Sequence, residues 1–151
     1  MKLIDKLFKT GALISLTAMI TAVTIQVFTR LFMDTTPHWT EEAARIFFIY
    51  SVAFGTGTGL RNGDFVRLDL IDSSMSRKTG RILDAVTDII VTIFAIVLFV
   101  HSLRFVRLGM DELSPALEIT MGLVFISMAI IGLAIAIFTV ADLQQIFKEK
   151  L

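Results

Sequence analysis

The chain has 151 residues, of which 55% are apolar and 19% charged, and its mean hydropathy is +0.78. Soluble domains are typically about 45–50% apolar and about one quarter charged, so this composition predicts an integral membrane protein. The 14 basic and 14 acidic residues balance, which disfavours nucleic-acid binding. The chain has no cysteine, which excludes disulfides, iron–sulfur clusters, thiolate zinc sites and thiol catalysis.

Four apolar stretches bracketed by charged residues predict four transmembrane helices in a single domain, residues 1–151. The approximate spans are residues 10–33, 43–60, 82–103 and 119–140. Three of them have the roughly 20 residues that a helix needs to cross a hydrocarbon core of about 30 Å. The second is shorter and can cross if its polar first turn lies at headgroup depth. The expected fold class is therefore an all-α integral membrane protein.

Lysine and arginine gather at both chain ends and in the connector between the second and third spans. The positive-inside rule therefore places both termini in the cytoplasm. The first span is too long for the apolar part of a secretory signal and lacks a small-residue cleavage site, so we expect it to stay uncleaved. Apolar residues recur at helical spacing within residues 3–8 and 65–75, which predicts short amphipathic segments along the cytoplasmic leaflet. For the second stretch an extended segment stays open, because apolar and polar residues alternate at 66–70.

The sequence offers little to an enzyme. Its two histidines are His38, in an outer loop, and His101, near the outer end of the third span. A metal or haem site needs several ligands that converge, and His101 has no Glu or His four residues away to complete a helical pair. We predict no catalytic residue, no cofactor and no metal, and a membrane enzyme is the third-ranked hypothesis.

An autonomous transporter needs ionisable groups or broken helices at mid-membrane. Asp84 and Asp88 lie four residues apart on one helical face, in the first turns of the third span. They leave open the alternative of a small exporter in which one of these carboxylates couples protons. A solvated or salt-bridged helix start is the simpler explanation, because acidic groups suit a helix N-terminus.

Small residues line one face of the second span, where Ser51, Gly55 and Gly59 recur every four positions. Such a face lets another helix approach closely. The fourth span has a similar strip at residues 129, 132 and 136. Packing within the four-helix unit would explain one such strip. The second strip would be explained by the same packing or by contact with another membrane protein. The sequence favours neither explanation.

The densest polar group lies at the outer end of the first two spans. It consists of Arg30, Trp39, Glu42 and Arg45. These residues share one depth, at which Trp belongs to the interfacial aromatic belt, and Glu42 precedes Arg45 by three positions on one helical face. A pair between Arg30 and Glu42 across the loop fits the same depth. On the residues alone, the simplest role of this group is to fix the helical hairpin at the headgroup layer.

At these residues the chain resembles the small membrane subunit, the DctQ-like component, of tripartite ATP-independent periplasmic (TRAP) transporters. The resemblance rests on motifs in a fixed order. They are Arg30, WTEEAAR at 39–45, Gly55, RNG at 61–63, RLD at 67–69 and GMDELSPAL at 109–117. The resemblance covers nearly the whole chain, with two departures: Phe65 stands where the family often has His, and Thr120 where it often has Pro.

The resemblance implies a bacterial inner-membrane scaffold, or stator, without enzymatic activity. Its implied partners are membrane lipid, a large elevator-type permease subunit and, through the outer loops, a periplasmic binding protein. The complex would import an organic acid with an ion, expected to be sodium, and a C4-dicarboxylate, a sialic acid and other carboxylates all stay open. Arg30, Glu42 and Arg45 would organise the outer interface. The cytoplasmic connector would be anchored by Arg61, Arg67 and Asp69.

Overall fold

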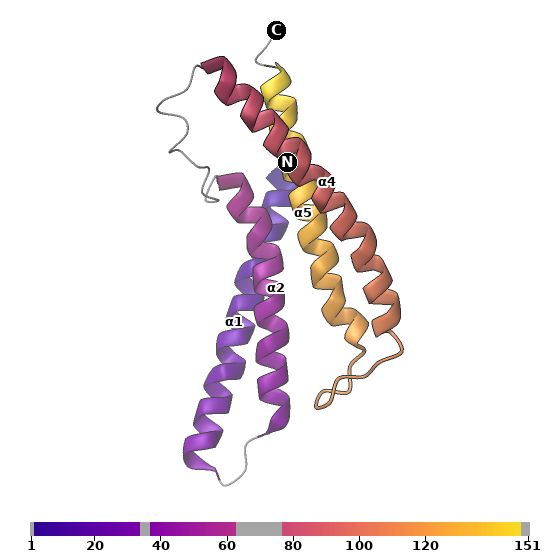
Figure 1. The fold of residues 1–151 in the computed structure, drawn as a ribbon. Coiled ribbons are helices and arrows are strands. Elements are labelled where there is room, and N and C mark those ends of the chain that lie inside the picture. Colours follow the sequence, from indigo (N-terminus) through magenta and orange to yellow (C-terminus); the bar gives the residue numbers. More distant parts are fainter. Residues whose placement is uncertain (1, 34–36, 63–76, 149–151) are drawn as a thin grey trace.

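The structure, a computed structural model, describes residues 2–33, 37–62 and 77–148, and this part of the chain forms four long helices (Figure 1). They are α1 (Lys2–Phe32), α2 (His38–Asn62), α4 (Arg77–Gly109) and α5 (Met121–Lys148). Each contains a segment long and apolar enough to cross a membrane. The predicted all-α class with four spans is therefore confirmed.

The helices extend beyond the predicted spans. Helix α1 already begins at Lys2, so the predicted amphipathic segment at residues 3–8 continues into the first span without a break. Within it Leu3 and Leu7 are exposed, whereas Phe8 is buried in the protein core. The second predicted amphipathic segment, residues 65–75, lies outside the described residues.

The helices pair into two hairpins, α1 with α2 and α4 with α5, and α2 also contacts α5. Figure 1 shows both termini at one end of the bundle. The connections between α1 and α2 and between α4 and α5 lie at the opposite end, which we call the loop end. Helix α2 is therefore the element through which the two hairpins meet.

The core nearest the termini is aromatic. We call Phe8, Phe54 and Phe138 the aromatic cluster, since the Phe8 ring meets the other two edge-on at centroid distances of 6.0 and 5.9 Å. Edge-to-face packing of this kind adds to the stability that burial itself provides. The cluster takes one residue from each of α1, α2 and α5, so it fastens the two hairpins together at this end.

Glycines set how closely the helices approach. A Cβ at Gly57 would lie 2.5 Å from the Phe8 ring, and one at Gly132 would lie 3.0 Å from the backbone nitrogen of Phe99. Gly132 thus gives α5 close contact with α4, as expected for the small strip of the fourth span. Gly55 differs, because a Cβ there would have no atom within 4 Å. The glycine of α2 that packs within the chain is Gly57 and not Gly55.

We expect Gly132→Ala to lower the thermal unfolding temperature of the detergent-purified chain, and Gly55→Ala to leave it unchanged or raise it slightly. The new methyl at residue 132 lies 3.0–3.2 Å from backbone atoms of α4, a contact that no side-chain rotation relieves, and an overpacking cost of about 1–3 kcal/mol outweighs the gain in helix propensity of about 1 kcal/mol. At residue 55 the methyl has open space and removes a helix penalty of about 1 kcal/mol. Differential scanning fluorimetry measures both, and equal midpoints would contradict the packing described here.

Candidate functional site

The α4–α5 connection at the loop end is an ordered turn. Its two sides meet at an isolated antiparallel bridge between Leu113 and Thr120. The backbone N–H of Ser114 donates to the carbonyl of Ile119 at 2.8 Å, and the N–H of Ile119 donates to the Ser114 hydroxyl at 3.3 Å. Glu118 adopts the left-handed conformation, with φ of 54°. Residues 115–118 are thereby held as a tight tip.

The side chain of Glu42 reaches this tip from α2. One carboxylate oxygen, Oε2, accepts hydrogen bonds from the backbone N–H groups of Ala116 at 2.8 Å and Leu117 at 3.0 Å. Ser114 lies close enough to act favourably on the charge of this carboxylate. Bonds from N–H groups to a charged acceptor are stronger than neutral ones. We call these four residues the Glu42 clamp.

The first turns of α2 aim Glu42 at the loop. Thr40 is fully buried, and its hydroxyl donates to the carbonyl of Pro37 at 2.7 Å, which fixes the start of the helix. The carboxylate of Glu42 lies near the N-terminus of α2, where the helix dipole favours negative charge. The clamp therefore uses an acidic residue in a place that stabilises its charge.

The ion pairs differ from the expected pair between Arg30 and Glu42. Among the described ion pairs, Arg45 bonds to Glu41 at 3.1 Å on an exposed face, and none joins Arg30 to Glu42. The reason is the rotation of α2, which turns Glu42 towards the α4–α5 loop and leaves Glu41 and Arg45 one helical turn apart facing outward. Arg45 is still close enough for its charge to act favourably on Glu42. Arg30 is exposed in the last turn of α1.

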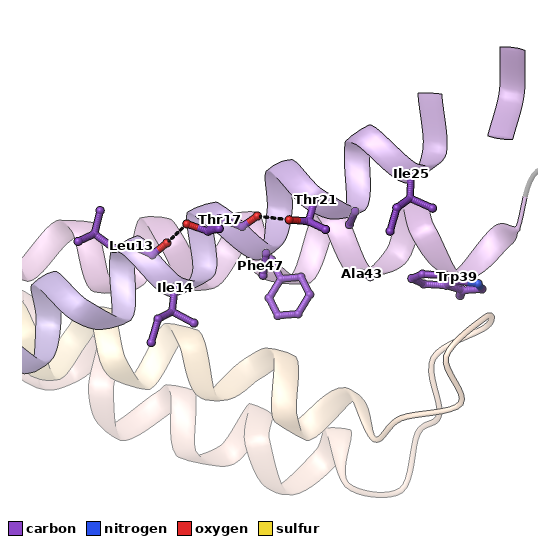
Figure 2. Close-up of a pocket in the computed structure, with 10 residues that line it drawn as sticks. Leu13, Ile14, Thr17, Thr21, Ile25, Trp39, Ala43 and Phe47 are labelled. Carbon is purple, nitrogen blue, oxygen red and sulfur yellow. Dashed lines mark hydrogen bonds between the residues drawn. The ribbon is translucent and has the colours of Figure 1, made fainter. Parts of the chain in front are cut away.

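Trp39 lies on another side of α2, so the four predicted loop-end residues do not form one cluster. Figure 2 shows Trp39 in line with Ala43 and Phe47, at one end of a groove between α1 and α2. Its side chain is partly exposed. Trp39 lies at the N-terminal end of α2, which is consistent with the interfacial depth expected of it. The Trp39 side chain takes no part in the clamp.

The predicted small strip of α2 remains half-exposed. The Ser51 hydroxyl donates to the carbonyl of Phe48 in its own helix at 2.8 Å, and Gly55 faces open space. Three residues are expected to anchor the cytoplasmic connector. Of these, Arg67 and Asp69 and the side chain of Arg61 lie outside the described residues.

The groups considered for metal binding and proton coupling are described only in part. No group of three or more His, Asp or Glu residues that could hold a metal occurs among the described residues. His38 and His101 are both exposed, in α2 and α4 respectively. Asp88 is half-buried in α4 near the termini, and the side chain of Asp84 is not described.

Tyr50 forms a second link between the hairpins, which the sequence did not lead us to expect. Its hydroxyl donates a hydrogen bond to the backbone carbonyl of Leu123, so it joins α2 to the first turn of α5. The signal was available, because Tyr50 is the one tyrosine of the chain and lies in an apolar span, where a hydroxyl needs a partner. Ser114 was recognised only as part of a motif, and its contact with Glu42 could not be read from spacing.

We expect Glu42→Ala to speed hydrogen–deuterium exchange at the amides of Ala116 and Leu117 by about tenfold or more, because both lose their acceptor. Glu41→Ala is the matched control, since it removes a neighbouring carboxylate whose partner is Arg45. Exchange mass spectrometry of the peptide covering residues 113–120 measures this. Equal exchange in the two variants would mean that Glu42 does not hold the loop.

Comparison with known proteins agrees with this architecture. The family model described as "Tripartite ATP-independent periplasmic transporters, DctQ component" matches residues 19–149. A Haemophilus influenzae protein named "Putative TRAP transporter small permease protein" is 23% identical over 149 residues, which cover 99% of this chain and 90% of the relative. The family match includes α2, α4, α5 and the Glu42 clamp. The chain therefore belongs to the DctQ family, the small permease subunits of TRAP transporters.

Proposed function

We propose that this subunit is a rigid scaffold that holds a large elevator-type permease subunit at a fixed depth in the bacterial inner membrane. The complex imports an organic acid, with sodium as the coupling ion, after a periplasmic binding protein delivers it. Both termini face the cytoplasm, and the loop end faces the periplasm. The chain itself has no catalytic role in this proposal, and no particular organic acid is assigned because the chain is not the part that binds it.

The observation that carries the proposal is the linkage of the two hairpins at three depths. The Glu42 clamp joins them at the loop end. Tyr50 joins α2 to α5 further along, and the aromatic cluster joins α1, α2 and α5 nearest the termini. Three separate links resist both sliding and splaying of the hairpins, and a scaffold needs this resistance while its partner moves.

The charge pattern of the spans favours a scaffold over a transport path. The sequence has no Asp, Glu, Lys or Arg at residues 10–29, 46–60, 89–103 or 119–141, and the charged residues inside the predicted spans, Arg30, Arg45, Asp84 and Asp88, lie near the span ends. Helices α1, α2 and α5 also run through their spans without interruption. Intramembrane transport sites are usually built from ionisable groups or from exposed backbone at broken helices. This favours the scaffold over the autonomous exporter that Asp84 and Asp88 suggested.

The proposed interfaces combine exposed residues and open space at the surface with residues outside the described part of the chain. The small strip at Ser51, Gly55 and Gly59 receives a helix of the large subunit, because space is open at Gly55. At the loop end Arg30 and Arg45 contact the partners, while Glu42 acts indirectly by fixing the loop that they meet. On the cytoplasmic side we assign Arg61, Arg67 and Asp69 to anchoring the connector between α2 and α4.

We expect Gly55→Leu to reduce co-purification of the large permease subunit several-fold, because the added side chain fills the space meant for a partner helix. Val97→Phe is the control, since Val97 is an exposed apolar residue of α4. A tag on the large subunit and quantitative immunoblotting of the small one measure the effect. Undiminished co-purification of the Gly55 variant would refute this interface, provided that its thermal midpoint matches the wild type.

The scaffold role itself is tested in sealed liposomes. We expect this subunit alone to show no uptake of any of the candidate acids, and the complex with its large subunit and binding protein to show sodium-dependent uptake. Radiolabelled substrate accumulation measures both. Uptake by the isolated subunit would refute the scaffold, whereas uptake by the complex without sodium would refute only the assigned coupling ion.

A further inference from the structure

A groove of about 550 Å³ runs between α1 and α2 (Figure 2). Small residues allow it to form. Ala22 and Ala43 are buried where the two helices approach, and Ala18 lines the groove beside them. Larger side chains, among them Ile14 and Phe47, line it as well. The groove lies within the membrane-spanning parts of both helices.

Apart from the indole N–H of Trp39 at one end, the lining is almost entirely apolar. It contains no charged side chain. Its two hydroxyls are used within α1, as Thr17 donates to the carbonyl of Leu13 at 2.8 Å and Thr21 to that of Thr17 at 2.9 Å. Figure 2 shows both bonds running along the helix. An occupant must therefore be apolar, because a polar group here would lose its bonds to water without replacement.

The length and width of the groove suit a hydrocarbon chain. It follows α1 from Leu13 to Ile25, and at a rise of 1.5 Å per residue this is about 18 Å, close to one leaflet of a hydrocarbon core of about 30 Å. Spread over that length, the volume corresponds to a cross-section of about 30 Å². A helix about 10–12 Å wide has a cross-section of roughly 80–110 Å². The groove therefore encloses a chain of hydrocarbon width, whereas a helix of another protein could only lie over it.

We propose that the groove binds one acyl chain of a phospholipid from the leaflet at the loop end. Trp39 marks the headgroup end, because indole rings prefer the membrane–water interface and Trp39 lies at the start of α2. The acyl chain extends from there towards Leu13. It fills space that would otherwise leave the lining side chains without contacts on one side. This inference needs only the membrane location and does not depend on the scaffold role.

The chain provides its own probe, since Trp39 is its one tryptophan. The full-length protein is purified in detergent and titrated with a phospholipid brominated on its acyl chain, which quenches tryptophan fluorescence on contact. We expect quenching to saturate at about one phospholipid per protein. Quenching that rises without saturation, as in random contact with dissolved lipid, would overturn the proposal.

Two variants fill the groove at different places, Ala18→Phe and Thr21→Phe. Both residues line it, and neither is fully buried. We expect each to weaken saturable quenching by about tenfold or more. Val97→Phe, on the exposed surface of α4, should titrate like the wild type. Native mass spectrometry of the same samples should show one bound phospholipid in the wild type and the Val97 variant only.

The complex with the large permease subunit distinguishes lipid from protein as the occupant. If the acyl chain fills the groove, the quenching of Trp39 persists in the purified complex, and native mass spectrometry retains the phospholipid. If a segment of the large subunit covers the groove instead, both signals disappear when the complex forms. That result would overturn the proposal, as would equal titration curves in the wild type and in both groove variants.

Discussion

The contact between the Glu42 carboxylate and the amides of Ala116 and Leu117 fixes the distance between the two hairpins at the loop end. Those amides lie in a tight tip where the turn itself offers them no acceptor among its described bonds. Ala116 is exposed and Leu117 is partly buried, and a charged acceptor makes a stronger bond to such amides than a neutral one does. The carboxylate therefore satisfies the loop and ties α2 to it in one interaction.

Helix α2 connects the bundle because its faces are specialised. Glu42 and Tyr50 point to the α4–α5 hairpin, and Gly57 admits the ring of Phe8 from α1. A helix that makes polar contacts on one side and tight contacts on another cannot be uniformly apolar. This explains why α2 is the least apolar of the four candidate spans. The polar residues of α2 lower its hydropathy, and the same residues join the two hairpins.

The sequence predicted the class of the fold because a membrane span leaves a strong signal, about 20 apolar residues between charges. It could not predict the rotation of α2. Glu41 and Glu42 are both within one helical turn of Arg45, so spacing alone allows either pair. The choice depends on a loop more than seventy residues away, whose N–H groups attract Glu42. The same holds for Phe8, which reads as an interfacial residue until Phe54 and Phe138 are brought beside it.

Gly55 and Gly57 show how little of a partner surface can be read from composition. They are two positions apart on α2, which places them on nearly opposite faces. The space beside Gly57 is filled by the Phe8 ring, whereas Gly55 faces open space. The α1–α2 hairpin thus has a strip suited to a helix and, separately, a narrow groove suited to a chain. In the proposed assembly the strip would meet a helix of the large subunit and the groove an acyl chain, so that each face would have one kind of neighbour.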